Sequence, residues 1–421
     1  MPPIGSSANA VLAWVDDPMN MVQGKSWRRP MAARKHSEGH RQASWLELFF
    51  DLSFVVAVAQ GAVQLEHFLA EGHAGSGLVS YLMVFAAIWW AWMAFTWFGN
   101  VFDIDDVPYR LLMMVMIAGS LGLAAGVPKI AQLDFRIGVL SYVVMRLAYV
   151  MLWVRVLRAG DPLWRPVAIK IITLTTINQA AWVLFLLVPL QWRAPAFIAL
   201  FAMDIATPLL AGWDARMGGH QGHIVERYGL FTIIVLGESI AAATIAVGRA
   251  IDSQLVSFPL LVLAGGGLAI VFALWWIYFD FCTGEAAGGS RPSQYLWGYG
   301  HFFLFAAIAA IGAGLSLSVE WIVDHHHVAL PEWGVAMVIG AAVATILVTI
   351  AFIESLAEQG GHVLLKFGGA LFAVAAAFAA PLVTVPGSIL LIGAMLAGMV
   401  AYGVVLQHRA HNESTQTNRP A

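Results

Sequence analysis

The chain has 421 residues, of which 60% are hydrophobic and 11% charged, with a formal net charge of −3. Soluble globular proteins carry charge on about a quarter of their residues, so this balance excludes a soluble globular domain. The absence of a long basic stripe argues against nucleic acid as a partner. The single cysteine, Cys282, excludes an internal disulfide framework and a cysteine-rich metal site.

Apolar runs long enough to cross a bilayer recur along the whole chain. A transmembrane helix needs about 20 mostly apolar residues, and the sequence offers twelve such runs separated by short loops. It therefore predicts an all-α, polytopic integral membrane protein with membrane lipids as its surroundings. The predicted spans are 46–68, 77–99, 108–126, 137–157, 166–190, 194–212, 226–248, 256–280, 294–318, 333–354, 362–380 and 387–407.

The spans show signs of an internal duplication. The run WWAW at 89–92 in the second span is matched by WWIY at 275–278 in the eighth, and Asp51 in the first span corresponds to Glu238 in the seventh. The two matches are separated by nearly the same number of positions along the chain, which favours two parallel six-helix repeats, as found in some transporters. Interfacial belts are also rich in tryptophan, so a chance match is the alternative. The expected halves are 44–212 and 213–407, and the tails 1–43 and 408–421 are expected to be cytosolic and disordered.

Positive charge is distributed unequally between the two sides of the predicted bundle. Lys and Arg are concentrated in the amino-terminal tail and in the loops on the same side of the membrane. Cytoplasmic loops carry the excess of these residues. The bias predicts a multi-pass inner-membrane protein with both termini in the cytoplasm. The other side carries only Lys129, Arg136, Arg193 and Arg249.

The first span carries carboxylates that lipid cannot accommodate. Ser44 and Glu47 fit an S-x-x-E capping box at its start. Glu47 and Asp51 lie one turn apart on the same face. A carboxylate at the centre of a membrane helix costs about 2.5–3.5 kcal/mol, which makes such residues functional candidates. The span is therefore expected to lie inside the bundle.

Three ionisable residues are predicted near the middle of the bilayer. At a rise of about 1.5 Å per residue, Arg146, Asp204 and Glu238 each lie about 14–18 Å into their spans, and Asn178 lies at a similar depth. If they converge, Arg146 neutralises one carboxylate, and the second becomes a proton-binding group. A static ion-pair network that holds the bundle together is the alternative interpretation.

Polar residues at the ends of spans offer weaker candidates. His223, Glu226 and Arg227 share one helix face at the start of the seventh span. A metal site formed by His220, His223 and Glu226 and interfacial anchoring are competing interpretations. No nucleotide, nucleophile or zinc-protease motif occurs in a supporting context. We therefore expect no catalytic residue, no metal site and no cofactor. Asp103, Asp105 and Asp106 at the end of the second span either capture cations or form a solvated loop.

Four stretches resemble a known family. The sequence reads ELFFDLSFVVAVAQ at 47–60, YVVMRL at 142–147, DIATPLL at 204–210 and HIVERYGLFTIIVLGES at 223–239. These stretches resemble the signatures of the bacterial low temperature requirement A family over about residues 44–405, although Tyr228 stands where a histidine is expected. The resemblance implies a polytopic membrane protein and no particular substrate. It draws attention to Glu47, Asp51, Arg146, Asp204, Glu226, Arg227 and Glu238.

The leading hypothesis is a secondary transporter or proton-coupled carrier of an unknown small solute. Glu238 and Asp204 would bind the proton or solute, Arg146 would supply the counter-charge, and Asp51 would be an acid nearer the cytoplasmic side. The second hypothesis is a non-transporting sensor or scaffold in cold or stress adaptation. The third is a membrane-embedded lipid-modifying enzyme that holds Mg²⁺ on aspartates. Under the first two the protein is not an enzyme, and a homo-oligomer is compatible with all three.

Overall fold

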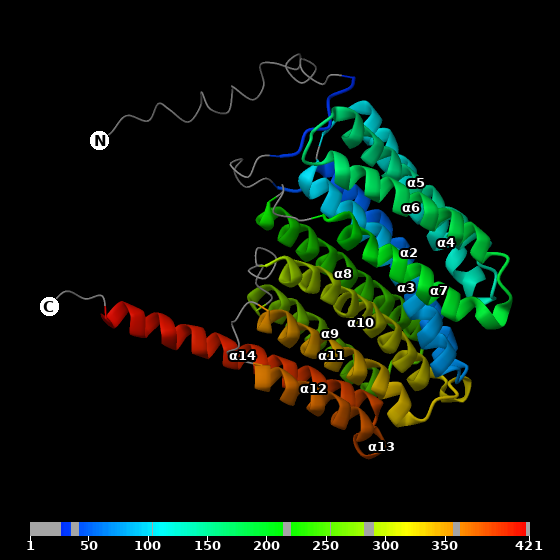
Figure 1. The fold of residues 1–421 in the computed structure, drawn as a ribbon. Coiled ribbons are helices and arrows are strands. Elements are labelled where there is room, and N and C mark those ends of the chain that lie inside the picture. The colour runs from blue at the N-terminus through cyan, green and yellow to red at the C-terminus, as the bar shows by residue number, and fades with distance from the viewer. Residues whose placement is uncertain are drawn as a thin grey trace, which may run out of the picture.

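The computed structural model describes residues 27–34, 42–102, 104–213, 220–252, 254–281, 290–356 and 363–417, and within these ranges the elements are all helices. Figure 1 shows the long helices running side by side across the molecule. They are α2 (Trp45–Ala70), α3 (Ala74–Val101), α4 (Val107–Ala131), α5 (Arg136–Ala159), α6 (Arg165–Phe185), α7 (Leu190–Ala211), α8 (Gln221–Asp252), α9 (Phe258–Phe281), α10 (Arg291–Val323), α11 (Glu332–Ser355), α12 (Val363–Phe378) and α14 (Val385–Thr417), with the short η3 (His325–His327) and α13 (Ala380–Val383).

The number of spans differs from the prediction at one place. Eleven of the described helices are long and apolar enough to cross a membrane. The predicted span 362–380 instead corresponds to α12, which has 16 residues and is followed by the four-residue α13. Pro381, in the first turn of α13, has no N–H to donate to a preceding turn, which accounts for the break between the two helices. At the carboxy-terminal end of the chain, α14 continues to Thr417, beyond residue 407, where the last predicted span ends.

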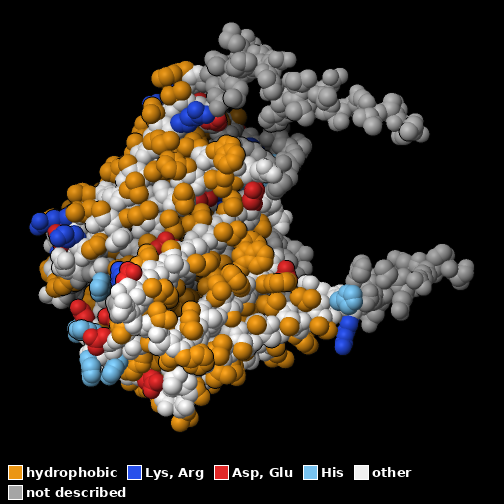
Figure 2. Space-filling model, turned by 180° about the vertical axis from the view of Figure 1, so that it is seen from behind, with side chains coloured by type: hydrophobic (Ala, Val, Ile, Leu, Met, Phe, Trp, Pro, Cys, Tyr) orange, Lys and Arg blue, Asp and Glu red, His pale blue; other side chains and the backbone are white. Residues whose placement is uncertain are grey.

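The outer surface is that of a protein surrounded by hydrocarbon. Figure 2 shows hydrophobic side chains over most of one flank, with charged side chains and histidines gathered mainly at its edges. Large apolar residues such as Leu111, Phe272 and Leu371 are more than half exposed on these helices. Exposed apolar patches of this extent are not found on soluble monomers. The chain is therefore a multi-pass membrane protein.

The central helices are α2, α3, α8 and α10. Helix α4 packs on α2 and α5, and α6 and α7 continue that flank. Helix α10 packs on α8 and α11, α12 follows α11, and α9 packs mainly on α14, so these helices form the other flank (Figure 1). Close packing of α4 on α5 depends on small residues, because a Cβ on Gly126 would lie 2.7 Å from the backbone nitrogen of Gly138.

Part of the amino-terminal segment that was expected to be disordered lies against the end of this bundle. Residues 27–34 are described, and Met31 is only 2% exposed. The backbone N–H of Arg29 donates to Asp106 at 2.8 Å, and the N–H of Arg34 donates to the carbonyl of Val101 at 3.1 Å. The segment is held in place because the ends of α3 and α4 present hydrogen-bond acceptors to it. The other residues of the 1–43 tail lie outside the described ranges, apart from 42 and 43.

Candidate functional site

The carboxylates of α2 meet α8 in a buried ionic cluster. The predicted capping box is present, with the Ser44 N–H donating to Glu47 Oε2 at 2.8 Å and the Glu47 N–H donating to Ser44 Oγ at 3.3 Å. Arg227 of α8 donates from Nε to Asp51 Oδ2 at 2.8 Å, from Nη2 to Asp51 Oδ1 at 2.5 Å and from Nη1 to Glu47 Oε1 at 3.1 Å. All three side chains have zero exposure. The pairing of both acids with one arginine ties α2 to α8.

Residues of α3 and the first turn of α8 complete this ionic cluster. Trp92 Nε1 donates to Asp51 Oδ1 at 2.7 Å, and Arg227 Nη2 donates to Thr96 Oγ1 at 3.3 Å. His223 Nε2 lies 3.5 Å from Glu47 Oε1, while its Nδ1 is 3.2 Å from Asn100 Oδ1. We define Glu47, Asp51, His223 and Arg227 as the ionic cluster. Its guanidinium is hydrogen-bonded through all three nitrogens, as expected of a structural group in a dry environment.

A second buried ion pair lies between α5 and α7. Arg146 Nη2 is 3.6 Å from Asp204 Oδ1, and both side chains are almost fully buried. Asp204 Oδ2 accepts hydrogen bonds from the Tyr142 hydroxyl at 2.7 Å and from Trp182 Nε1 at 2.9 Å. The two predicted midplane residues therefore do meet. Their contact is longer than a hydrogen bond, because that limit is about 3.2 Å for N–H···O.

Arg146 is surrounded by aromatic rings rather than by acceptors. Its Cζ lies 4.8 Å from the ring centroid of Tyr149 and 5.8 Å from that of Trp90, both within the range of cation–π contacts. Among the described residues it makes no hydrogen bond, and its buried Nε has no partner. Asp204 Oδ1 is likewise without a hydrogen bond in this part of the chain. A guanidinium carries five N–H donors, so Arg146 has donors to offer a further group.

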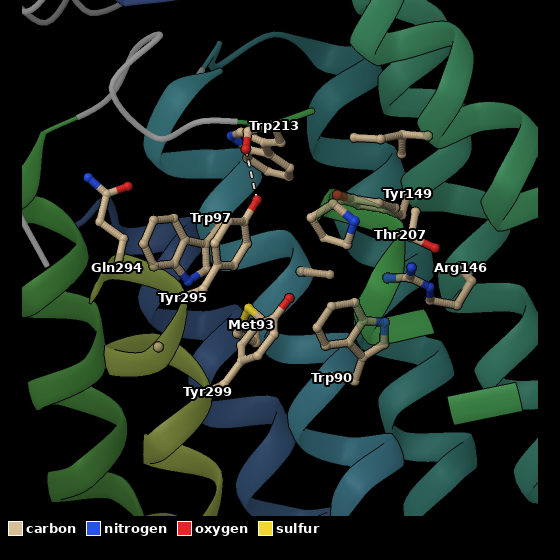
Figure 3. A pocket seen from close by; sticks show the side chains of 14 residues that line it. Trp90, Met93, Trp97, Arg146, Tyr149, Thr207, Trp213, Gln294, Tyr295 and Tyr299 are labelled. Atoms are coloured by element: carbon tan, nitrogen blue, oxygen red, sulfur yellow. Dashed lines mark hydrogen bonds between the residues drawn. The ribbon is translucent and has the colours of Figure 1, made fainter. Parts of the chain in front are cut away.

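The Arg146 side chain reaches a cavity of about 40 Å³ among α3, α5, α6, α7 and α10. Figure 3 shows Arg146 and Tyr149 on one side of this space and Trp97, Tyr295 and Tyr299 on the other. The hydroxyls of Tyr295 and Tyr299 donate away from it, to the backbone carbonyls of Trp213 and Ile205. The cavity therefore presents one cation within largely aromatic walls. Its aromatic lining consists of Trp90, Trp97, Tyr149, Trp213, Tyr295 and Tyr299.

Helix α3 separates the cavity from the ionic cluster. Trp90, Met93, Ala94 and Trp97 follow helical i, i+3, i+4, i+7 spacing and line the cavity. On another face of the same helix, Trp92, Thr96 and Asn100 contact the ionic cluster. Each of these two faces of α3 consists of residues that recur at helical spacing in the sequence.

Proline 208 gives the cavity an irregular wall on α7. Pro208 lies in the interior of α7 and lines the cavity together with Thr207. Proline has no N–H, so the carbonyl of Asp204 lacks its usual helical donor. Asn178 lies at the same level, where its Nδ2 donates to the carbonyl of Leu200 at 3.2 Å and its Oδ1 has no partner among the described residues. Buried polar atoms of this kind are ordinarily satisfied by water or a ligand.

Two other predicted site residues, Glu238 and Glu226, belong neither to the ionic cluster nor to the Arg146–Asp204 ion pair. Glu238 is half-buried on α8, and no hydrogen bond or ion pair joins it to Arg146 or Asp204 in the described ranges. Glu226 accepts a hydrogen bond from the backbone N–H of Ala43 at 3.4 Å, at the start of α2. The predicted convergence therefore holds for Arg146 with Asp204 and does not extend to Glu238. Arg227, by contrast, lies at the centre of the ionic cluster.

The acidic loop after α3 has a structural explanation where it is described. Asp106 caps α4 by accepting from the Tyr109 N–H at 2.9 Å, and it also accepts from Arg155 Nη2 at 2.5 Å. Burial alone raises the pKa of Asp106, but hydrogen bonds from Arg155, Arg29 and Tyr109 hold it below its usual value. Asp105 pairs with Arg110, and Asp103 lies outside the described residues. No group of metal-binding side chains is found in the part of the chain that the structure describes.

Sequence reasoning missed the residues that surround the Arg146–Asp204 ion pair. Tyr142 and Trp182 fix Asp204, and Trp90 and Tyr149 surround Arg146. A signal was available for two of them. Tyr142 precedes Arg146 by four residues, so both lie on one face of α5, and Tyr149 follows by three. The pairing between α2 and α8 had no such local signal.

These features define a class of protein: a polytopic α-helical membrane protein with a buried ionic cluster and an arginine-bearing aromatic cavity. The model of the bacterial low temperature requirement A protein (LtrA) family matches residues 42–402, and the chain belongs to this family. An uncharacterized protein of Rhizobium meliloti (strain 1021) is 26% identical over 318 residues, covering 72% of this chain and 76% of that relative. The resemblance seen in the four sequence stretches is thereby confirmed.

Proposed function

We propose that this LtrA-family protein is a secondary carrier of a small solute, with the Arg146 cavity as its solute site. The observation that carries the proposal is a buried guanidinium that lines a cavity and makes no hydrogen bond within the described residues. A buried guanidinium whose N–H groups have no hydrogen-bond acceptor is costly. A protein tolerates that cost where a ligand or solvent completes the site. On this proposal the protein catalyses no chemical step.

Asp204 gives the proposed carrier a means of coupling solute to protons. Its Oδ1 is 3.6 Å from Arg146 and accepts no hydrogen bond in the described part of the chain. A solute that takes Arg146 away from Asp204 leaves a buried carboxylate, which proton binding can neutralise. Solute and proton then move together. Glu238 has no part in this scheme, while Glu47, Asp51 and Arg227 hold α2 and α8 in place.

The proposal is tested with purified protein in liposomes that contain a pH-sensitive dye. An inward gradient of a small anion should drive proton uptake by the wild-type protein, and Arg146→Gln should abolish it. Arg136→Gln is the matched control, because Arg136 belongs to the same helix but its side chain is 81% exposed. Equal fluxes in Arg146→Gln and wild type would remove Arg146 from the transport mechanism.

A second candidate function is a non-transporting sensor or scaffold in cold or stress adaptation. The ionic cluster favours it, because every nitrogen of the Arg227 guanidinium is already hydrogen-bonded and the group is sealed from solvent. If this candidate is right, the wild-type protein shows no coupled flux with any small ion. Arg146 variants then alter only thermal stability.

We also propose that the protein lies in the inner membrane with both termini in the cytoplasm. The excess of Lys and Arg on the amino-terminal side supports this orientation. It requires α12 and α13 to cross the membrane together. In a Cys282→Ser background, an impermeant maleimide added to spheroplasts should label Glu71→Cys, in the α2–α3 loop, and should not label Asp161→Cys, in the α5–α6 loop. The reverse pattern would invert the orientation.

The two parallel six-helix repeats, 44–212 and 213–407, remain part of the proposal. The packing order supports it: α4 lies on α2 and α5 as α10 lies on α8 and α11, and α3 contacts α7 as α9 contacts α14. If the halves are parallel, each half expressed alone with a carboxy-terminal reporter should place the reporter on the same side of the membrane. Reporters on opposite sides would exclude a parallel repeat.

A further inference from the structure

We propose that the Arg146 cavity binds a small planar oxyanion with delocalised charge, of the carboxylate or nitrate type. This inference rests on the cavity that the proposed carrier uses, and it names the chemical class of the solute. It makes a claim about binding that can hold whether or not the protein transports anything.

Two buried hydrogen-bond donors of residues that line the cavity lack acceptors within the described ranges. Arg146 Nε is buried without a partner among the described residues, and the indole Nε1 of Trp90 is also buried without one. Both residues line the cavity. A planar guanidinium fork matches the two oxygens of a planar oxyanion. A bound anion of this shape would satisfy donors that the surrounding protein leaves unused.

The cavity has the size of a small anion. A cavity holds one water molecule when the space open to the centre of a water-sized sphere is about 10–15 Å³. The volume of about 40 Å³ therefore accommodates roughly three water-sized positions. Formate, acetate and nitrate have three or four heavy atoms each and correspond to this size.

The walls of the cavity are largely aromatic. Aromatic faces from Trp90, Tyr149 and Tyr299 offer stacking surfaces to a flat ion. They offer few hydrogen bonds, so a strongly hydrated tetrahedral anion such as sulfate would lose its water shell without replacement. Cations are disfavoured by the charge of Arg146. The site therefore favours small planar monoanions over the sulfate dianion.

Charge balance predicts how binding depends on pH. Asp204 faces Arg146 and Tyr142 from α5 and the uncharged Trp182 from α6. With Asp204 ionised, the pair is neutral and an incoming anion adds an uncompensated charge. A proton taken from water onto Asp204 removes that excess charge. Anion binding should therefore be tighter at acidic pH, with about one proton taken up per anion.

The test measures binding by the purified full-length protein in nanodiscs. Isothermal titration calorimetry with sodium nitrate and with sodium formate should give saturable binding at acidic pH, and sodium sulfate at equal ionic strength should give none. Arg146→Gln should lose nitrate binding, and Arg136→Gln should keep it. Saturable sulfate binding of equal strength, or no saturable binding of nitrate or formate, would overturn the proposal.

Conservative variants keep the proposal testable if Arg146→Gln fails to fold. Arg146→Lys retains the charge but loses the planar fork, and it should weaken nitrate binding about tenfold. Trp90→Phe keeps an aromatic face but loses the indole N–H and one of the two fused rings, so it should also weaken binding. Asp204→Asn should keep binding but lose its pH dependence; retained pH dependence would contradict the role of Asp204. Nitrate binding without nitrate-driven proton flux would support this site and reject the carrier.

Discussion

Arg227 and Asp51 form a two-point hydrogen-bonded pair across α2 and α8, at 2.8 and 2.5 Å, with neither side chain exposed. The other buried arginine, Arg146, stands 3.6 Å from its carboxylate and makes no hydrogen bond in the described residues. The same residue type thus occupies two opposite environments in one bundle. The Arg227–Asp51 pair stabilises the fold. Arg146 keeps N–H donors that a molecule bound in the cavity can use.

The first prediction concerns the relative stability of variants at these two arginines. Removal of one partner from a buried ion pair costs about 3–5 kcal/mol, so Arg227→Ala should lower the free energy of unfolding by about that amount. Arg146→Ala should cost clearly less, because Asp204 retains two hydrogen bonds. Unfolding by SDS titration in mixed micelles measures both. Equal losses would show that Arg146 is as structural as Arg227.

The second prediction uses a glycine in the cavity wall. A Cβ on Gly298 would lie 3.3 Å from Trp97 Cζ2 and 3.3 Å from the Tyr228 hydroxyl, two groups that are hydrogen-bonded to each other. Gly298→Ala should narrow the cavity, weaken anion binding and cost about 1–3 kcal/mol of stability. Gly300→Ala is the control, because its nearest neighbour would be at an ordinary 3.6 Å. Equal anion affinity in the two variants, measured by calorimetry, would contradict this role for Gly298.

The third prediction concerns a buried ion pair on the other flank. Lys366 Nζ of α12 donates to Glu354 Oε2 of α11 at 2.8 Å, and both side chains are less than 10% exposed. Lys366→Met or Glu354→Gln alone should destabilise the protein by about 3–5 kcal/mol, whereas the double variant should lose less than the sum of the two. A double-mutant cycle of unfolding free energies tests this. Strict additivity would mean that the two groups do not interact.

The fourth prediction concerns acid stability. The pKa of Asp106 is lowered in the folded protein despite burial, because Arg155, Arg29 and Tyr109 donate hydrogen bonds to it. Its contribution to stability is therefore complete above the unfolded value of about 3.9 and is lost as the pH falls through the lower folded value. Thermal unfolding below about pH 4 should show a pH-dependent loss in the wild type that is smaller in Asp106→Asn. Identical acid dependence would exclude Asp106 as a contributor.

The sequence was sufficient for the membrane class and for the meeting of Arg146 with Asp204, since a constant rise per residue sets the depth of each side chain. It was not sufficient for Glu238. Depth does not define which way a helix faces or which helices are its neighbours. Glu238 is half-exposed on α8 and makes no contact with Arg146 or Asp204 in the described ranges.

The ionic cluster also depends on which helices are neighbours, and the sequence alone does not show this. The periodicity placed Glu47 with Asp51 on one helix face, and His223 with Arg227 on another. Their contact spans more than 170 positions along the chain, and hydropathy contains no information on that pairing. The capping box at Ser44 was predictable because it depends on four consecutive residues alone.

The two-faced packing of α3 restricts how the protein can change shape. Trp92 and Thr96 fasten the helix to the ionic cluster, while Trp97 donates to the Tyr228 hydroxyl of α8 at 2.9 Å. The helix cannot turn about its axis or slide without breaking several buried bonds at once. Any motion that opens the cavity must therefore come from α5, α6, α7 or α10, which also line it, and a movement of α5 with α7 carries the guanidinium and its carboxylate together past the stationary residues of α3.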